Sequence, residues 1–433
     1  MANKHLRIAF IIKALPTKGK FMKKFSTTCL TIILIFALLL IHEKELYGGG
    51  FSLYAGSARG NALGAALIAR ADDPSAIFYN PAGITQLPGL QIAGGGTLVH
   101  PRNHVTTEFL GSREESELKS NWFFPPYGYL TYQKTDRLWF GVGLFPRFGL
   151  GTEFDDDWPG RYNSYNAFLK SLEINPNIAY RITDRFSVAA GLSIMRIDVK
   201  LQQKILLIDV DSTLKCHSYG WGFNLALRYA PCDWMAVGLS YRSKVKHNLN
   251  GHADFIKADF LRKLFPDGPF QADLTLPDEY SLGVVFKPLD RVSIEFDAIL
   301  TRWRSFDHVT INFDDGILGL DEITKNKNWH DIWRYQIGLE YALTRMLDIR
   351  FGYVYDNTPI PKGTVDYLVP LNDRQHFNCG FGVHWDCWSV DLSYTYIRSK
   401  NRHYDARLLD GVLAGRIHDI DAHLIGFGVG YKF

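Results

Sequence analysis

Cysteine is scarce in this chain of 433 residues, which contains five cysteines in all. Cys216, Cys232, Cys379 and Cys387 lack the close spacing of a metal site or of a disulfide framework. We interpret these four cysteines as small apolar residues. Long apolar runs are lacking as well. The mean hydropathy of −0.10 excludes a bundle of membrane-spanning helices.

An excess of one charge is also missing once the N-terminal segment is set aside. The formal net charge is +3, but residues 1–47 hold eight Lys and Arg against two Glu. The rest of the chain therefore carries 40 basic and 43 acidic residues, which removes the argument for a nucleic-acid surface. No P-loop is present, and we expect no cofactor. The acidic run at 155–157 is interpreted as a solvated loop, rather than as a calcium site or a divalent-ion bridge to lipopolysaccharide.

The first 48 residues are typical of a leader. Lys23 and Lys24 precede an apolar run over residues 29–41, after which the chain turns polar. A charged segment followed by an apolar core of this length predicts a cleaved signal peptide. Met22 stands where such a peptide should begin, so we expect the true start there and cleavage between residues 41 and 50. A membrane anchor is the alternative, but the run is short for ~30 Å of hydrocarbon.

From residue 90 onward, apolar and polar side chains alternate. In residues 388–396 the even positions are apolar and the odd positions are polar or charged, and residues 334–341 and 292–300 repeat the pattern. A period of two over eight or more residues predicts β-strands with one apolar and one polar face. The end of the chain, "IGFGVGYKF" at 425–433, agrees, with five apolar residues on one face and three glycines and a lysine on the other.

The connections between these strands alternate strictly between short and long. Six short turns are expected at 134–136, 183–185, 231–233, 287–290, 344–346 and 386–387. Seven long polar stretches are expected near 101–121, 149–167, 203–215, 251–272, 313–330, 357–374 and 399–418. Short turns at one end, long loops at the other and an even number of strands are typical of an outer-membrane barrel. We therefore predict an all-β transmembrane protein whose residues 90–433 form a 14-stranded antiparallel β-barrel.

Residues 49–89 do not fit the strand pattern. The stretch "ADDPSAIFYNPAGITQLPG" (71–89) has three prolines, which each remove a backbone donor, and five apolar side chains that need burial. Residues 61–71 are helix-like, with breaks at 72–74 and 80–81. A barrel of fourteen strands is too wide for its own side chains to fill. We therefore predict that residues 49–89 form a partly helical hatch inside the lumen, because ~40 residues are too few for a separate domain.

Five short motifs then resemble, in the same order along the chain, those of the FadL family of outer-membrane transporters of long-chain fatty acids and hydrocarbons. They are "NPAGI" (80–84), "FGLGTEFDDDWPGRY" (148–162), "LPDEYSLGV" (276–284), "YDNTPIP" (355–361) and "VPLNDRQHF" (369–377). The resemblance covers nearly all of residues 49–433. It implies passive, gated uptake in which the ligand enters a lumenal pocket and leaves sideways into the membrane. It also implies that the terminal Phe433 is read by the barrel assembly machinery.

A lateral exit requires an interruption in the barrel wall. Pro146 interrupts the predicted third strand, where it forfeits a hydrogen bond that lipid cannot replace. By resemblance, Pro146, Arg147, Phe148 and Gly149 mark the lateral opening; the alternative is a strand that ends at the membrane rim.

For gating, the resemblance points to Asn80, Pro81 and Ala82 of the hatch. Asn80 before proline also suits a local backbone cap. We expect Asn80 to bond to the barrel wall, with Asp356 as its partner.

Long-chain fatty acid is the preferred cargo, and aromatic or other hydrocarbons are the alternative. A buried carboxylate requires a cation, and Arg147, Arg161 and Arg196 are available, but the ligand-binding residues are not assigned. Nothing places a nucleophile beside a base, so neither a lipid hydrolase nor any other enzyme is favoured. An open pore is the third option. The expected partners are the ligand, outer-membrane lipid and lipopolysaccharide, and the expected state is a monomer.

Overall fold

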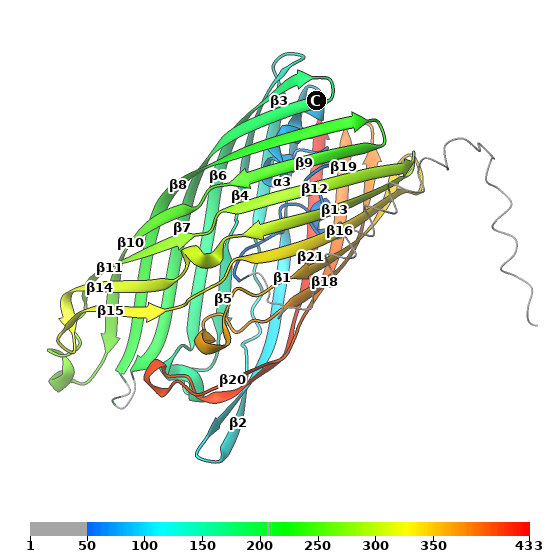
Figure 1. Cartoon of the computed structure of the whole chain (residues 1–433). Helices are drawn as coiled ribbons and strands as arrows, with labels where there is room; N and C mark the ends of the chain where they lie inside the picture. Colours follow the sequence, from blue (N-terminus) through cyan, green and yellow to red (C-terminus); the bar gives the residue numbers. More distant parts are fainter. Residues whose placement is uncertain (1–49, 206–207, 209) are drawn as a thin grey trace, which may run out of the picture. The chain divides into compact units, whose positions relative to one another are not determined.

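The computed structural model describes residues 50–205, 208 and 210–433. The predicted signal peptide and the start at Met22 lie outside the described residues. The chain divides into two units, residues 1–46 and residues 47–433. The second unit consists of strands around a small helical segment (Figure 1).

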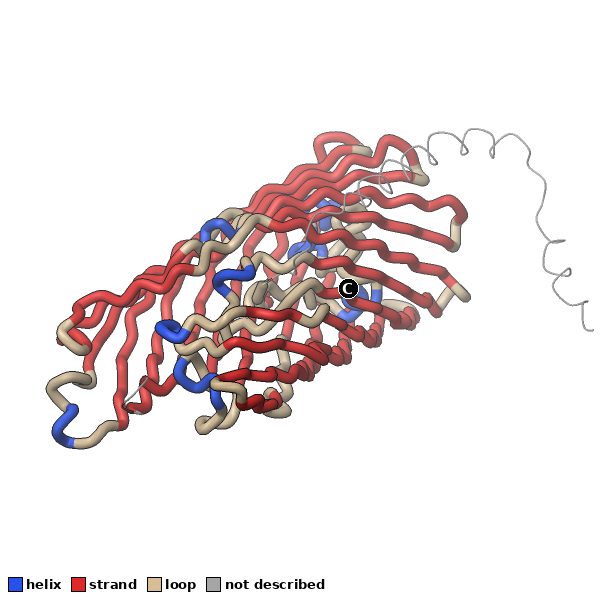
Figure 2. Tube along the Cα trace, turned by 60° about the horizontal axis from the view of Figure 1, so that its bottom comes forward, coloured by secondary structure: helices blue, strands red, loops and turns tan. Residues whose placement is uncertain are grey.

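The strands of this unit form one continuous antiparallel sheet that closes on itself. Closure occurs because β1 (Leu90–Phe109) pairs with β21 (Ala414–Lys432), from Gln91 opposite Lys432 to Glu108 opposite Ala414. The result is the predicted 14-stranded barrel. Figure 2 shows the strands as a ring with short helices and loops gathered inside it and at one end.

Five of the fourteen wall strands consist of two segments each. In chain order, the wall segments between β1 and β21 are β3 (Pro126–Gln133), β4 (Leu138–Phe145), β5 (Gly149–Glu153), β6 (Asn166–Thr183), β7 (Phe186–Ile205), β8 (Val210–Cys232), β9 (Met235–Arg242), β10 (Val245–Ile256), β11 (Gly268–Leu276), β12 (Glu279–Leu289), β13 (Val292–Thr301), β14 (His308–Ile317), β15 (Leu320–Asn326), β16 (Ile332–Ala342), β17 (Leu347–Asp356), β18 (Arg374–Trp385) and β19 (Trp388–Ser399).

The loops at the long end carry further short elements. They are β2 (Ser112–Glu117), η2 (Pro159–Tyr162), η3 (Asp259–Leu261), η4 (Trp303–Ser305), η5 (Lys362–Thr364), β20 (Arg402–Tyr404) and η6 (Leu408–Asp410). Several predicted loops are shorter than expected: the connection expected at 203–215 spans only 206–209, because β7 and β8 continue above the apolar band. The outer face of this extension is polar, with Lys200, Gln202 and Lys215, so the segment resembles a polar loop in the sequence. Leu201 and Leu214 still face each other on the inner face, and strand pairing continues.

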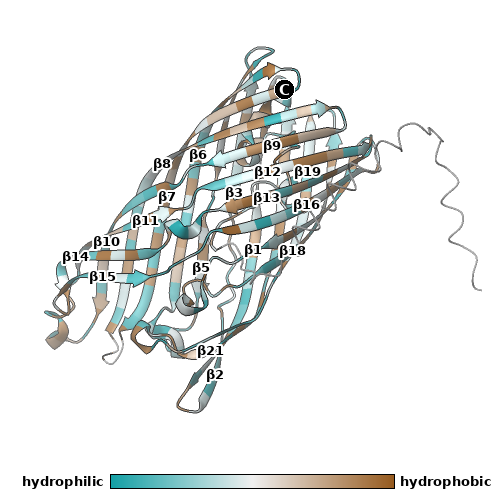
Figure 3. Ribbon diagram, viewed as in Figure 1, coloured by the Kyte–Doolittle hydropathy of each residue, from teal (hydrophilic) through white to brown (hydrophobic). Residues whose placement is uncertain are grey.

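The alternation of faces in the wall follows the sequence pattern. Every odd-numbered side chain of β6 from Ala167 to Ala179 is buried, whereas Ile174, Ile178 and Tyr180 on the other face are exposed. The outer face of β6 is therefore apolar toward its short-turn end, and Figure 3 shows hydrophobic and hydrophilic residues alternating along the wall strands. Among the described residues, no helix has the length and apolar character needed to cross a bilayer.

The hatch lies in the lumen and contains α2 (Ala58–Ala62), α3 (Ala76–Tyr79) and η1 (Pro81–Gln86). α2 contacts β17, β18, β19 and β21, whereas η1 contacts β4, β6, β7 and β8 on the other side of the ring. Ser57 and Asn80 are the N-cap residues of α2 and η1. The Ser57 side chain accepts from the N–H of Gly60, and the Asn80 side chain accepts from the N–H of Ala82.

The helix expected over residues 61–71 is wrong. α2 ends at Ala62, and Gly64 and Ala65 have positive φ angles of 62° and 63°. The backbone N–H groups of residues 68–70 bond to carboxylates of β13 instead of to the preceding turn. Acceptors supplied by the wall therefore replace the helical hydrogen bonds that local propensity favours.

Candidate functional site

The third wall strand is interrupted where Pro146 predicted. β4 ends at Phe145 and β5 begins at Gly149, and both segments pair with β6. Between them, Ser171 of β6 satisfies the backbone, because its Oγ accepts from the N–H groups of Arg147 (3.1 Å) and Phe148 (2.9 Å). The interruption therefore turns the strand without breaking its contact with β6.

On the side of the interruption that faces β3, the third strand has no paired neighbour. β4 pairs with β3 only as far as Leu144 opposite Gly128. Beyond the gap, the N–H of Lys119, in the connection before β3, donates to the carbonyl of Glu153 at the end of β5 (2.8 Å). The residues that face each other across this gap include Pro125 and Pro126 on one side and Pro146 on the other. Because proline has no backbone N–H, these positions cannot close the ladder.

Residues 51–53, which precede the hatch helices, occupy this unpaired edge from inside the barrel. The N–H of Leu53 donates to the carbonyl of Arg147 (2.8 Å), and the N–H of Gly149 donates to the carbonyl of Phe51 (3.0 Å). The side chain of Leu53 lies against Gly149, where a Cβ would come within 2.9 Å of it. A short stretch of the hatch thus substitutes for the missing strand.

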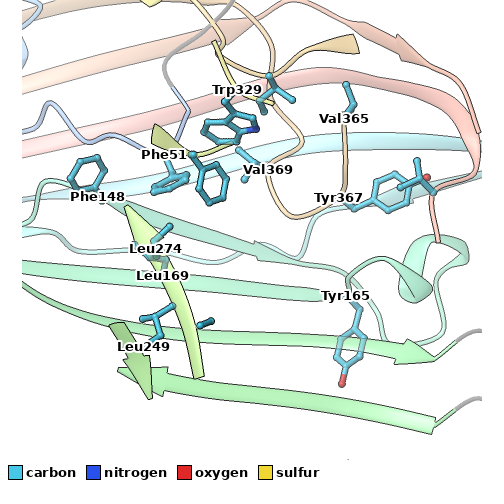
Figure 4. Close-up of a cluster of buried hydrophobic side chains, with 14 of the residues drawn as sticks. Phe51, Phe148, Tyr165, Leu169, Leu249, Leu274, Trp329, Val365, Tyr367 and Val369 are labelled. Atoms are coloured by element: carbon cyan, nitrogen blue, oxygen red, sulfur yellow. The ribbon is translucent and has the colours of Figure 1, made fainter. Parts of the chain in front are cut away.

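Phe51 is held in a cluster of aromatic side chains, part of which Figure 4 shows. Its ring centroid lies 4.7 Å from that of Trp303, 5.7 Å from that of Trp329, 5.9 Å from that of Phe306 and 6.0 Å from that of Phe148. Three of these partners come from the interruptions in the ninth and tenth wall strands, where the chain folds inward. We call these five side chains the aromatic cluster.

A cavity of about 590 Å³ runs from the lumen to the gap in the third strand. Its lining is largely apolar and includes Trp122, Phe123, Phe124, Leu150 and the three prolines of the gap. This volume lies in the range that accommodates organic ligands. A ligand of mainly hydrocarbon character fits such a lining, since each buried CH₂ contributes about 0.8 kcal/mol.

The inner end of the cavity is charged. Arg334, Asp356 and Arg374 stand opposite one another on β16, β17 and β18, which places a carboxylate between two guanidinium groups. Arg374 Nη2 lies 2.6 Å from Asp356 Oδ2, and the hydroxyl of Tyr54 donates to the same oxygen at 3.0 Å. The guanidinium of Arg334 stacks on the ring of Tyr54.

A second cavity of about 30 Å³ lies on the other side of residues 52–54 and is lined by Arg147, Arg242 and Arg334. Glu173 lies 3.6 Å from Arg147 and 3.2 Å from Arg242, and Glu279 lies 3.9 Å from Arg334. Together with Asp356 and Arg374, this region contains four arginines against three carboxylates. A single positive charge is therefore left over next to an apolar cavity.

The expected pair of Asn80 and Asp356 does not form. Asn80 Nδ2 donates to the carbonyls of Ile68 (2.7 Å) and Leu227 (3.0 Å), so it does bond to the barrel wall, but through the backbone of β8. Asp356 is instead neutralised by Arg374, which lies opposite it in register. The Asp356 carboxylate pairs with the guanidinium of Arg374 rather than with the Asn80 amide, because a charge-assisted hydrogen bond is stronger than a neutral one.

Two carboxylates of β13 hold the turn that leads to Asn80. Glu295 accepts from the N–H groups of Ala69 (2.6 Å) and Arg70 (3.1 Å), and Asp297 accepts from the N–H of Ile68 (3.3 Å). Both side chains are fully buried. Pro81 and Ala82 follow in η1, where they are buried.

The other cations proposed from the sequence lie elsewhere. Arg161 bonds to the backbone of its own loop and to Tyr162, and Arg196 faces outward and pairs with Asp198 at 2.8 Å. In the acidic loop, Asp155 pairs with Lys119 at 3.4 Å. Within the described residues, no group of three or more His, Cys, Asp or Glu side chains is arranged to hold a metal ion.

Sequence reasoning missed the aromatic cluster and the charged inner end of the cavity. Pro125 and Pro126, at the start of β3, remove backbone donors just as Pro146 does within the third strand, and could have located the second edge of the gap. The row of Arg334, Asp356 and Arg374 could have been found by aligning the predicted strands, since opposite charges favour facing positions. The inward folding of Trp303 and Trp329 has no comparable local signal.

Comparison with known proteins identifies a matching family. A family model described as "Outer membrane protein transport protein (OMPP1/FadL/TodX)" matches residues 44–433. An outer membrane protein of Neisseria meningitidis serogroup B is 26% identical, over 93% of this chain and 98% of the relative. The long-chain fatty acid transport protein of Escherichia coli O6:H1 is 22% identical, over 83% of this chain and 89% of the relative.

Two solved structures share the fold. A Pseudomonas aeruginosa FadL homologue superposes with a TM-score of 0.79 and 20% identity, and covers 89% of this chain and 100% of its own. The toluene transporter TodX of Pseudomonas putida superposes with a TM-score of 0.68 and 17% identity, and covers 90% of this chain and 99% of its own.

Proposed function

Because this chain belongs to the OMPP1/FadL/TodX family of outer membrane transport proteins, we propose that it takes up long-chain fatty acids by passive transport across the outer membrane. The ligand binds in the apolar cavity and leaves sideways into the membrane at Pro146, Arg147, Phe148 and Gly149. The observation that carries the proposal is the cavity itself, because it connects the lumen with an unpaired edge of the wall.

The preference for a fatty acid rests on charge. The four arginines and three carboxylates around Tyr54 leave one positive charge in a buried region, which matches the single charge of a fatty carboxylate. Residues 52–54 separate this charge from the apolar cavity, so the carboxylate reaches the arginines when these residues move. The apolar cavity then receives the alkyl chain.

Gating follows from the same contacts. Residues 51–53 close the gap through two backbone hydrogen bonds to the third strand. Residues 68–70 are instead bonded to Glu295 and Asp297 of β13, and the carbonyl of Ala69 accepts from Arg228 of β8. We therefore assign the moving part to the segment before α2, and the fixed part to Asn80, Pro81 and Ala82. Ligand binding beside Tyr54 shifts the balance toward the open gap, because the ligand competes for the space that this segment occupies.

The decisive experiment is uptake of labelled oleate by cells that lack their own transporter. Cells that express this protein should accumulate oleate, and cells with the empty vector should not. If the barrel is present in the outer membrane but oleate does not enter, the fatty-acid assignment is wrong.

Aromatic hydrocarbons are the second candidate, favoured by the low polarity of the cavity lining and by the structural likeness to a toluene transporter. Labelled toluene uptake in the same cells separates the two cargoes. Arg147→Gln should weaken oleate binding by roughly tenfold or more, since a charge-assisted hydrogen bond contributes about 1.5–3 kcal/mol. Arg147→Gln should leave toluene binding unchanged. Arg304→Gln, which changes an exposed arginine, is the control and should also leave toluene binding unchanged.

A further inference from the structure

The outer face of β6, β7 and β8 changes abruptly from apolar to basic. Ile194 and Trp221 stand opposite each other at the top of the apolar band, and the next pair is Arg196 and Tyr219. Trp221 is 67% exposed and Tyr219 60% exposed. Aromatic side chains that face outward at this level mark the boundary between hydrocarbon and headgroups in transmembrane barrels.

Two lysines face each other directly above this boundary. Lys200 of β7 and Lys215 of β8 are partners in register, and both face outward, because Ile197 and Ser218 on the alternate positions are buried. Side chains opposite each other in an antiparallel pair have Cβ atoms about 4.5–5.5 Å apart, and like charges there are destabilising. A bound anion between the two lysines would offset this repulsion.

The protein itself supplies no such anion within its described part. Neither lysine forms an ion pair there. Of the acids beside them, Asp198 pairs with Arg196 at 2.8 Å, and the Asp254 carboxylate lies 3.5 Å from Nε2 of His252. A third lysine, Lys170 of β6, lies opposite Asp198 and likewise has no ion pair among the described residues. We call Lys170, Lys200 and Lys215 the lysine triad.

We propose that the lysine triad binds the phosphates of lipopolysaccharide in the outer leaflet. The surface continues the lipid-facing wall, lies at the end of the barrel that carries the long loops, and has a charge opposite to that of the lipid A phosphates. Lys170 also lines the cavity at the gap, opposite Gly149. The bound lipid therefore stands beside the point where the cavity meets the membrane. The proposed binding of lipopolysaccharide to the lysine triad does not depend on which cargo the protein transports.

The test uses the purified full chain and native mass spectrometry with added bisphosphorylated lipid A. The variant is Lys200→Gln with Lys215→Gln. The matched control is Lys134→Gln with Lys287→Gln, which removes two exposed lysines at the short-turn end of the barrel. One lysine at a membrane surface is worth about fivefold in affinity, so the double variant should bind roughly 25-fold less lipid A and the control should bind it normally. Lys215→Gln alone, with an expected fivefold loss, replaces the pair if the pair fails to fold.

Binding of two further lipids, phosphate-free lipid A and phosphatidylglycerol, tests whether the bound anion is the lipid A phosphate. Wild-type protein should bind phosphate-free lipid A as weakly as the double variant binds the phosphorylated form. Phosphatidylglycerol binding should differ little between the wild type and the double variant. Equal lipid A binding by wild type and variant, or no preference for the phosphorylated form, overturns the proposal. A matching loss of phosphatidylglycerol would identify a general anionic surface and overturn the assignment to lipopolysaccharide.

Discussion

The backbone N–H of Leu53 donates to the carbonyl of Arg147 at 2.8 Å, across the one edge of the third wall strand that β3 does not reach. This bond joins the start of the hatch to the interruption in the wall, although the two residues are far apart in the sequence. The segment that blocks the lumen is thus the same segment that completes the sheet. We therefore expect that a movement of residues 51–53 frees the cavity and uncovers the gap.

The aromatic cluster should set how tightly the gap is closed. Phe51→Ala removes the side chain that packs on Trp303 and Trp329, and loss of a buried Phe costs about 3–5 kcal/mol. The barrel wall does not depend on this side chain, so the loss should fall on the N-terminal segment. We expect a higher ion conductance in planar bilayers than for the wild type. Phe109→Ala, which truncates an exposed side chain at the end of β1, should conduct as the wild type does.

Asn80 and Asp356 should act independently, since they share no hydrogen-bond partner. Asn80→Ala removes a cap and two bonds to backbone carbonyls, with an expected cost of about 1–3 kcal/mol in the local stability of the hatch. Asp356→Ala leaves Arg374 without its carboxylate. In a double-mutant cycle on unfolding free energy, the two effects should add within about 0.5 kcal/mol. A coupling above about 1 kcal/mol would show that the residues interact after all.

Glu295 should be the main anchor of the hatch turn. Glu295→Ala removes the acceptor for the N–H groups of Ala69 and Arg70, and bonds to a charged acceptor contribute about 1.5–3 kcal/mol. Hydrogen exchange should therefore become faster at residues 68–71 and remain unchanged at residues 51–53. The exposed Glu322→Ala serves as control. Unchanged exchange at residues 68–71 would contradict the clamp.

One loop should depend on pH. Burial raises the pKa of Asp373, in the loop before β18, to about 6, although Lys400 Nζ lies 3.2 Å from its carboxylate. The unfolded chain titrates this group with a pKa of about 3.9. Between about pH 4 and pH 6 the folded protein therefore retains a proton that the unfolded chain has lost, so stability decreases as the pH rises through this window.

The corresponding measurement is hydrogen exchange of residues 357–373 at pH 4.5 and pH 7, corrected for intrinsic rates. Protection should be greater at the lower pH in the wild type, and Asp373→Asn should abolish the difference. A wild-type loop whose protection is the same at both pH values would show that burial does not shift this carboxyl group.

The strand number, the hatch and the interruption of the third strand were all predictable because each has a local signature. Alternation identifies the strands, the order of short and long connections counts them, and Pro146 cannot pair. The hatch helix over residues 61–71 was predicted wrongly because its competing acceptors, Glu295 and Asp297, lie more than 220 residues away in the sequence. A contact of that range is invisible to propensity.

The polar part of the site shows the same limit. Asp356 was predicted to pair with Asn80 of the hatch, whereas the strand register places Arg334 and Arg374 on either side of it. The strand register could have been predicted by pairing the predicted strands. The inward turn of residues 302–307 could not have been predicted, because a tryptophan that packs inside a barrel and one that faces lipid look alike in the sequence.

The central claim, release through the gap in the third strand, is tested most directly by filling that gap. Gly149→Phe places a ring at the gap, where only the flexible end of Leu53 must yield, whereas Gly128→Phe places the same ring in open space on the same wall. We predict that Gly149→Phe lowers labelled oleate uptake at least tenfold while the purified protein still binds oleate, and that Gly128→Phe transports normally. Equal uptake by both variants would contradict lateral release at this position.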